Sequence, residues 1–212
     1  MTVTSLVLPL AMATVGTVLC PLFVAVGMRQ LHGPARTRVR LQVACLVLGC
    51  LWGFTTGSIS SGAAEWPLRL ALVAWGAALI AAAACDAVTQ RVPTSLVRTS
   101  FLGAGTAIAA ALLLHGDVRA VAITAIATAA ATLTLLACWR FAGAGFGDVR
   151  LAALGGLGLG QVTASGVVLG LAAMVVVTMV QTALVVSRGG DRRTLMPLGP
   201  ALAVGFLVAA AA

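Results

Sequence analysis

The sequence predicts an all-α protein whose helices form a polytopic transmembrane bundle. Of its 212 residues, 61% are hydrophobic and only 8% are charged, whereas about a quarter of the residues of an ordinary soluble domain are charged. The mean hydropathy is +1.11, and the apolar residues come in runs of about 20, the length that a helix needs to cross a bilayer. Because these runs lack the two-residue period of a barrel strand, we expect helices.

Gaps that contain charge, glycine or proline divide the chain into eight apolar segments. In chain order they cover residues 3–27, 41–60, 68–85, 97–114, 119–139, 148–160, 163–187 and 196–212. The first is longer than the core of a signal peptide and has no preceding basic residue, so we expect a retained helix. The sixth is too short to span alone unless it bends or tilts with the seventh, which predicts seven to eight membrane segments. No long linker interrupts them, so we expect one integral membrane domain over residues 1–212.

The distribution of charge predicts the orientation of the bundle. The formal charge is +8, but all thirteen basic residues are arginines that stand mostly singly in short gaps, which argues against a nucleic-acid partner. If the N-terminus faces outward, the inward gaps 29–40, 86–98, 140–150 and 188–193 hold eleven of the thirteen, and only Arg69 and Arg119 face outward. Basic residues in short loops mark the cytoplasmic side. We therefore expect a multi-pass protein of the plasma membrane with these gaps in the cytoplasm.

The glycines are spaced for helix packing. Gly49-x-x-x-Gly53-x-x-x-Gly57 and Gly166-x-x-x-Gly170 would let helix backbones approach closely in lipid.

Neither cysteines nor histidines suggest a metal or a cofactor. The five cysteines contain no C-x-x-C pair and mostly lie within apolar runs, which is typical of small packing residues: Cys20, Cys45, Cys50, Cys85 and Cys138. His32 and His115 fall on opposite sides of the predicted membrane. This arrangement argues against a catalytic triad and against a histidine metal site.

Two of the five acidic residues are candidates for chemistry. Asp86 directly follows an apolar run that ends at Cys85, where the third segment leaves the bilayer. Asp148 closes Gly143-Ala-Gly145-Phe-Gly147-Asp148 before an apolar helix, so its carboxylate should lie near a helix N-terminus. The remaining acids are interpreted as solvated loop charges: Glu65, Asp117 and Asp191.

Each candidate taken alone is equally compatible with a structural role, Asp86 as the end of a helix and Asp148 as an N-cap. After Asp86, Pro93 is followed by Thr94 and Ser95, which we expect to cap the next helix. The pair is more informative, because the arginine count places both acids on one membrane face. Two carboxylates held close together share a proton, so one can take a proton from water while the other gives one to an amide carbonyl. This is the chemistry of an aspartic protease.

At these residues the sequence resembles the prepilin peptidase (type IV leader peptidase) family of bacterial membrane aspartic proteases. Three segments carry the resemblance in the family's order: Asp86-Ala-Val-Thr-Gln-Arg-Val-Pro93, Gly145-Phe-Gly147-Asp148-Val149-Arg150-Leu151 and Met196-Pro197-Leu198-Gly199-Pro200. The resemblance covers about residues 70–205 and implies that Asp86 and Asp148 are the catalytic pair. It further implies cleavage of the short basic leader of prepilins or pseudopilins, the precursors used in type IV pilus assembly and protein secretion, at the cytoplasmic membrane face.

The N-terminal third departs from the family pattern. Longer members carry paired C-x-x-C motifs after their first helix, whereas the gap from Arg29 to Arg40 contains no cysteine. We therefore assign no methyltransferase activity to this chain.

Four further residues are predicted to contact substrate. The Gly145–Gly147 loop would lie along the extended scissile segment. Arg91 or Arg150 would pair with the Glu that follows the cleavage point in substrates of the resembled family. The alternative for both arginines is that they contact lipid phosphates.

Other functions compete with the peptidase interpretation. A small transporter would also use intramembrane acids, although near the middle of the bilayer. A related protease that cuts within membrane helices could use the same pair of acids. The third alternative is a non-catalytic membrane subunit of a pilus or secretion machine.

Overall fold

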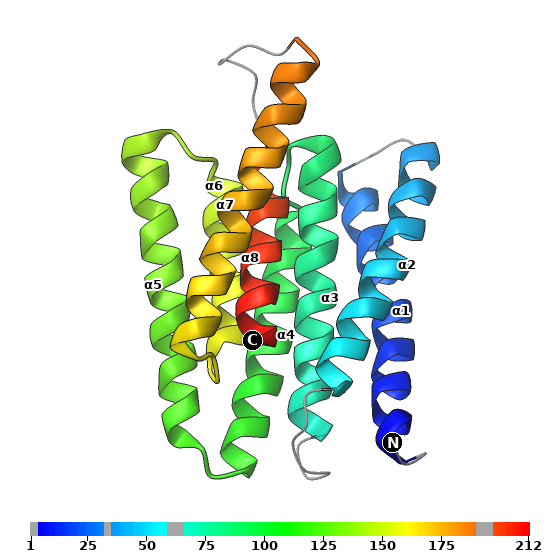
Figure 1. Cartoon of the computed structure of the whole chain (residues 1–212), viewed down its shortest axis with the longest axis vertical. Coiled ribbons are helices and arrows are strands. Elements are labelled where there is room, and N and C mark those ends of the chain that lie inside the picture. Colours follow the sequence, from blue (N-terminus) through cyan, green and yellow to red (C-terminus); the bar gives the residue numbers. More distant parts are fainter. Residues whose placement is uncertain (1–3, 32–34, 59–65, 190–196) are drawn as a thin grey trace.

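The computed structural model describes residues 4–31, 35–58, 66–189 and 197–212. In this part of the chain there are eight α-helices and a short 3-10 helix, with no strand. They are α1 (Thr4–Gln30), α2 (Ala35–Ser58), α3 (Trp66–Thr89), α4 (Thr94–Leu114), α5 (Val118–Ala142), α6 (Phe146–Gly156), η2 (Leu157–Leu159), α7 (Ala164–Ser187) and α8 (Gly199–Ala211). The eight helices correspond in order to the eight predicted apolar segments (Figure 1).

The predicted helical membrane bundle is confirmed. Six of the described helices are long and apolar enough to cross a membrane, namely α1, α2, α3, α4, α5 and α7. The other two are shorter, with 11 residues in α6 and 13 in α8. Many large hydrophobic side chains are exposed on the long helices, for example Leu133 on α5 and Val168 on α7. A protein with such a surface is a multi-pass membrane protein, because the bilayer covers these side chains.

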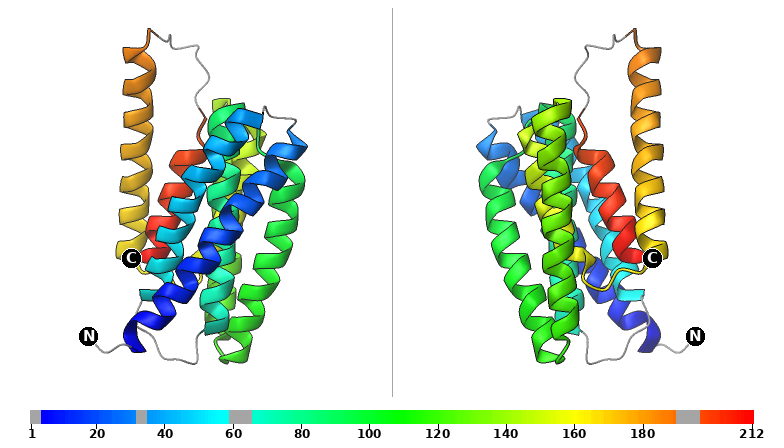
Figure 2. Two further views of the ribbon diagram at one scale, coloured as in Figure 1. Left: turned by 90° about the vertical axis from the view of Figure 1, so that its right-hand side faces the viewer. Right: turned by 90° about the vertical axis from the view of Figure 1, so that its left-hand side faces the viewer.

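Helix α3 is the centre of the bundle. It packs against α1, α2, α4, α6 and α8, and most of its residues are buried. By contrast, α5 and α7 have few buried residues and lie on the outside, with α7 packed on the outer side of α8 (Figures 1 and 2). Asp86, the first of the two candidate acids, lies in the last turn of this central helix.

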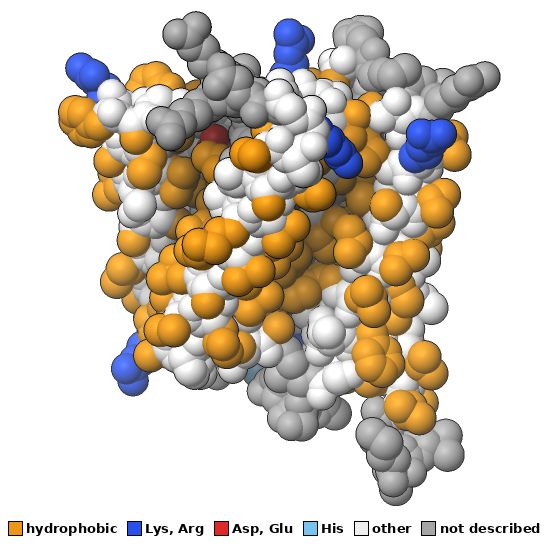
Figure 3. Space-filling view, turned by 45° about the horizontal axis from the view of Figure 1, so that its top comes forward, with side chains coloured by type: hydrophobic (Ala, Val, Ile, Leu, Met, Phe, Trp, Pro, Cys, Tyr) orange, Lys and Arg blue, Asp and Glu red, His pale blue; other side chains and the backbone are white. Residues whose placement is uncertain are grey.

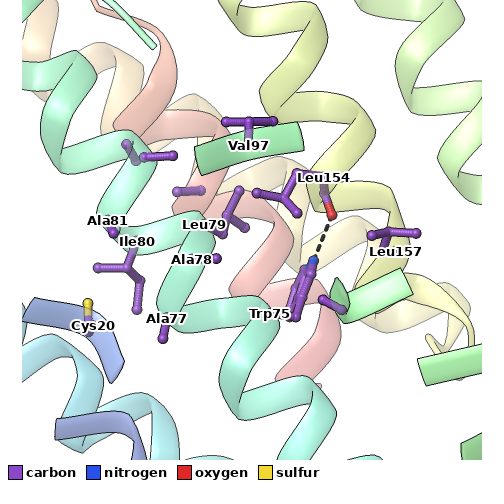
Figure 4. Packing of buried hydrophobic residues seen from close by; sticks show 14 of the residues in the cluster. Cys20, Trp75, Ala77, Ala78, Leu79, Ile80, Ala81, Val97, Leu154 and Leu157 are labelled. Atoms are coloured by element: carbon purple, nitrogen blue, oxygen red, sulfur yellow. Dashed lines mark hydrogen bonds between the residues drawn. The ribbon is translucent and has the colours of Figure 1, made fainter. Parts of the chain in front are cut away.

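Two tryptophans fix α6 and α2 to α3. The indole N–H of Trp75, which is fully buried, donates to the backbone oxygen of Leu154 at 2.7 Å (Figure 4). Trp52 of α2 donates to the backbone oxygen of Leu72 at 3.0 Å and meets Trp75 edge to face, with ring centroids 5.7 Å apart. A buried indole N–H needs a partner of this kind, and here the partners are backbone groups of neighbouring helices.

The predicted packing role of the spaced glycines is confirmed. A methyl group on Gly49 would collide with the backbone of Gly16 in α1, and one on Gly53 would collide with the backbone of Met12. A methyl group on Gly170 would come within 2.5 Å of the backbone oxygen of Gly205 in α8. The α1–α2 and α7–α8 pairs therefore depend on close backbone approach, as small residues allow in lipid.

The arginines gather at one end of the bundle. This basic end is the upper end in Figure 1, where the α3–α4 and α5–α6 connections lie, and it carries most of the described arginines, including Arg29, Arg91 and Arg140. Arg69 and Arg119 lie in the first turns of α3 and α5, at the opposite end. That the basic end faces the cytoplasm stays a prediction. Six residues named in the predictions from the sequence lie outside the described ranges: His32, Glu65, Asp191, Arg192, Arg193 and Met196.

Candidate active site

Asp86 lies in the last turn of α3 and contacts the start of α8. Its Oδ2 accepts a hydrogen bond of 3.0 Å from the backbone N–H of Gly199, and the residue is only 6% exposed. Because Gly199 is the first residue of α8, the carboxylate lies where backbone N–H groups and the helix dipole favour a negative charge.

Helix α3 extends about one turn beyond the predicted apolar segment 68–85. The helix continues to Thr89, because Ala87, Val88 and Thr89 all accept helical backbone angles. It ends at Gln90, whose φ of 52° is left-handed and whose N–H donates to the backbone oxygen of Asp86 at 2.8 Å. The predicted cap by Thr94 or Ser95 was wrong. The N-cap of α4 is Pro93, and no side chain caps this helix.

Asp148 lies in the first turn of α6, as predicted. Its Oδ2 accepts a hydrogen bond of 3.1 Å from the backbone N–H of Gly145, the N-cap residue. The side chain is 8% exposed. Burial raises the pKa of the Asp148 carboxyl above its ordinary value and the charge of Asp86 raises this pKa further, while the hydrogen bond from Gly145 acts in the opposite direction.

One cavity at the basic end contains both acids. It has a volume of about 600 Å³ and is lined by Asp86 and Asp148 together with all four residues predicted to contact substrate, namely Arg91, Gly145, Gly147 and Arg150. The α3–α4 and α5–α6 connections supply further lining, and Leu31 after α1 and Pro197 and Leu198 before α8 contribute as well. The fold therefore assembles residues that are up to 167 positions apart in the chain, from Leu31 to Leu198, around two carboxylates.

Two glycines let the elements of this cavity meet. A methyl group on Gly147 would come within 2.8 Å of Cγ2 of Val92, which follows Asp86 in the α3–α4 connection. A methyl group on Gly199 would come within 2.6 Å of Oδ2 of Asp86. Gly145 is less crowded, since its added methyl group would meet only Oδ2 of Asp148, at 3.3 Å. Of the two glycines predicted to line the substrate, Gly147 is therefore the one that the packing requires.

The two predicted substrate arginines have different surroundings. Arg91 is exposed in the α3–α4 connection. Arg150 donates from Nη1 to Oγ1 of Thr94 at 2.6 Å, and its guanidinium carbon lies 4.9 Å from the centre of the Phe146 ring. Arg150 thus ties α6 to the start of α4, whereas Arg91 is oriented by no such contact among the described residues.

The remaining titratable groups lie elsewhere. Asp117 caps α5 by accepting a hydrogen bond from the N–H of Ala120 at 2.9 Å, at the end of the bundle opposite the cavity. Cys20, Cys45 and Cys85 are buried and free, in line with the predicted packing role. Within the described ranges, no group of three or more His, Cys, Asp or Glu is arranged to hold a metal ion.

The arrangement suits proton transfer to and from a peptide bond. One oxygen of each carboxylate is held by a backbone N–H, and neither second oxygen has a hydrogen-bond partner within the described part of the chain. These two oxygens are left for a water molecule and a substrate carbonyl. A carboxylate pair that shares one proton supplies both the base and the acid for hydrolysis of an amide.

Sequence reasoning missed Gly199 and Val92 as parts of the site. The sequence identifies Pro197-Leu-Gly-Pro200 only as a motif, because the contact of Gly199 with Asp86 spans 113 positions. The signal was present in Gly199 itself, because a glycine next to a proline at the start of a helix adds nothing to helix stability and so points to a close contact.

Comparisons with protein-family models, with curated proteins and with solved structures found no match to this chain. The functional assignment accordingly depends on the site and on the motifs that line it.

Proposed function

We propose that this protein is a membrane aspartic endopeptidase that removes the leader peptide of prepilin-like precursors at the cytoplasmic membrane face. The observation that carries the proposal is the cavity at the basic end, where Asp86 from α3 and Asp148 from α6 lie together. All three segments that resemble the prepilin peptidase family contribute to its lining, through Asp86, Asp148 and Leu198. Segments that converge on one cavity are better evidence for a shared function than segments matched only in the sequence.

The proposed reaction uses water and no cofactor. The ionised carboxylate of the pair takes a proton from water, whose oxygen attacks the scissile carbonyl carbon. The protonated carboxyl donates its proton to the carbonyl oxygen. As the C–N bond breaks, the nitrogen takes up a proton from one carboxyl of the pair, and a hydroxyl of the tetrahedral intermediate returns its proton to the other carboxylate. This step releases the leader acid and the mature amine and restores the pair with one shared proton. Burial and the charge of Asp86 both raise the pKa of the Asp148 carboxyl, as expected for two acids that share one proton.

The position of the acids favours this function over a transporter. Both are at helix ends on one side of the bundle, in the last turn of α3 and the first turn of α6. Transport sites are usually near the middle of the bilayer. A precursor with a basic leader and an apolar mature helix presents its cleavage point at the membrane surface, which is the level of this cavity.

The test is cleavage of a purified precursor by the reconstituted protein. The precursor has a short basic leader, a glycine before the cleavage point and an apolar mature helix. We expect Asp86→Asn and Asp148→Asn each to reduce cleavage at least about 10³-fold, because neither carboxylate can replace the other. Asp117→Asn is the matched control, since Asn also caps helices and this residue lies at the opposite end.

Three outcomes decide the proposal. Loss of cleavage in both site variants with an active Asp117→Asn variant supports the assignment. Near-normal cleavage by either site variant removes that residue from the catalytic pair. If the wild-type protein cleaves no such precursor, the peptidase function is wrong, and a non-catalytic membrane subunit becomes the better interpretation.

A further inference from the structure

An apolar groove runs along one side of the bundle and begins beside Asp86. It has a volume of about 480 Å³, with α3 as its floor and α2 and α8 as its walls. Figure 3 shows a hollow lined by hydrophobic side chains on this face of the molecule. The lining residues include Ala84 and Ala87 of α3, Leu48 of α2, and Pro200, Val204 and Leu207 of α8.

The groove and the cavity with the two acids share their structural elements. Ala87 follows Asp86 directly on α3, and Pro200 follows Gly199, whose N–H binds Asp86. One end of the groove is therefore next to the Asp86–Gly199 hydrogen bond.

The lining defines the chemistry of the occupant. No residue of the lining is charged, and nearly all are apolar. Such a groove in a membrane accepts only a segment whose backbone hydrogen bonds are satisfied internally, which means a helix. The floor carries small side chains, including Ala84 and Ala87, and small residues let a second helix approach closely in lipid.

The dimensions fit the first turns of a helix. On α8 the lining extends from Pro200 to Ala211, which is roughly 16 Å at 1.5 Å per residue. Leu48 on the opposite wall is exposed, so this side of the groove faces the bilayer. A membrane helix can therefore enter laterally from the bilayer.

We propose that this groove binds the apolar helix that follows the cleavage point of the precursor, and so places the scissile bond at Asp86 and Asp148. The inference rests on the proposed peptidase function, because it takes its occupant from that reaction. It explains how a cavity at the membrane surface selects a substrate that is itself held in the membrane.

The first test fills the groove without touching the acids. Ala84→Trp on the floor and Val204→Trp on the α8 wall each place a large side chain in it. We expect each to raise KM for the precursor about tenfold while kcat stays within about twofold, which is the effect of losing one close helix contact in lipid. Ala110→Trp, on an exposed face of α4, is the matched control and should leave both constants unchanged.

Cleavage of a short peptide distinguishes an effect on the groove from an effect on the cavity that holds the acids. The peptide carries the leader and the first few mature residues but lacks the apolar helix. The two groove variants should cleave this peptide as well as the wild type does. Unchanged KM for the full precursor in both variants, with an active wild type, overturns the groove inference while the peptidase function stands.

Crosslinking tests the groove independently of catalysis. A photoreactive amino acid replaces Leu207 in the groove, or Ile126 on the exposed face of α5 as the control, in an Asp148→Asn background. We expect the precursor's helix to be captured from position 207 and not from position 126. Capture of only lipid or a second copy of the chain at position 207 overturns the inference, even if the protein cleaves no precursor.

Discussion

Replacing Gly199 by alanine perturbs Asp86 without changing any charge or titratable group. In the wild-type protein the backbone N–H of Gly199 donates to Oδ2 of Asp86 at 3.0 Å. The added methyl group would lie 2.6 Å from the same oxygen and 3.0 Å from Cβ of Asp86. Carbon and oxygen atoms that are not bonded do not approach this closely, so either the carboxylate or the start of α8 must move away.

The size of the effect follows from the hydrogen bond that this movement breaks. A hydrogen bond to a charged group contributes about 1.5–3 kcal/mol. If the bond from Gly199 orients Asp86 for catalysis, its loss should slow cleavage by roughly 10- to 150-fold, since about 1.4 kcal/mol corresponds to a factor of ten. Because Asp86 is almost completely buried, little of this loss can be recovered from solvent.

The assay is cleavage of a precursor, with thermal unfolding measured on the same samples. Gly103→Ala in α4 is the control, because no atom lies within 4 Å of its added methyl group. Alanine at this helical position should stabilise the protein by up to about 1 kcal/mol and leave cleavage unchanged. If Gly199→Ala cleaves at the wild-type rate while remaining folded, the contact between α8 and Asp86 has no role in catalysis and the reasoning is refuted.

Three further predictions concern the same end of the bundle. Gly147→Ala places a methyl group 2.8 Å from the stiff side chain of Val92, so we expect a loss of about 1–3 kcal/mol in unfolding free energy and reduced cleavage. The pKa of Asp148 lies above its ordinary value near 3.8, so its protonated form stabilises the fold fully below that value, and this stability is lost as pH rises through the raised pKa. Cleavage should fall over the same rise in pH, and Asp148→Asn should flatten the pH dependence of thermal stability there; an unchanged stability profile contradicts the prediction. Finally, a single cysteine at Arg188 in a cysteine-free variant should be shielded from impermeant thiol reagents in intact cells, whereas one at Asp117 should react. The reverse pattern would invert the orientation.

Much of the fold follows from the lengths of the apolar runs. A bilayer requires about 20 apolar residues per helix, so the number and order of the helices can be predicted from the sequence alone. Helix ends are less predictable, because they depend on local contacts. Helix α2 begins at Ala35 rather than near residue 41, and α3 continues past Asp86 to Thr89. In both cases the helix continues past the apolar run into a stretch that contains charged residues, since backbone hydrogen bonds continue at the membrane surface irrespective of side-chain polarity.

The two acids of the candidate site could be predicted from the sequence, but the contacts that hold them could not. Asp86 and Asp148 are conspicuous in a chain with so few charges, and the arginine pattern places both at one end. The sequence could not show that α8 supplies the hydrogen bond to Asp86, because that contact depends on how helices far apart in the chain pack on α3. Nor could it distinguish Arg150, which is held by Thr94, from the exposed Arg91, because that difference arises only when α4 and α6 meet.

The packing between the two ends of the bundle bears on the choice between a hydrolase and a transporter. The cavity with the two acids lies at the basic end, and a second cavity of about 210 Å³ lies near the opposite end, beside Arg69 and Thr163. Between them α3 and α6 are joined by fully buried side chains, Trp75, Leu79 and Leu154 among them. A polar solute or proton would need a path through this layer, and interiors packed to this density offer none without rearrangement. A site closed toward the membrane interior and held by backbone N–H groups at two helix starts is suited to fixing a peptide bond at the surface. The apolar groove proposed to bind the substrate helix begins beside Asp86, next to this site.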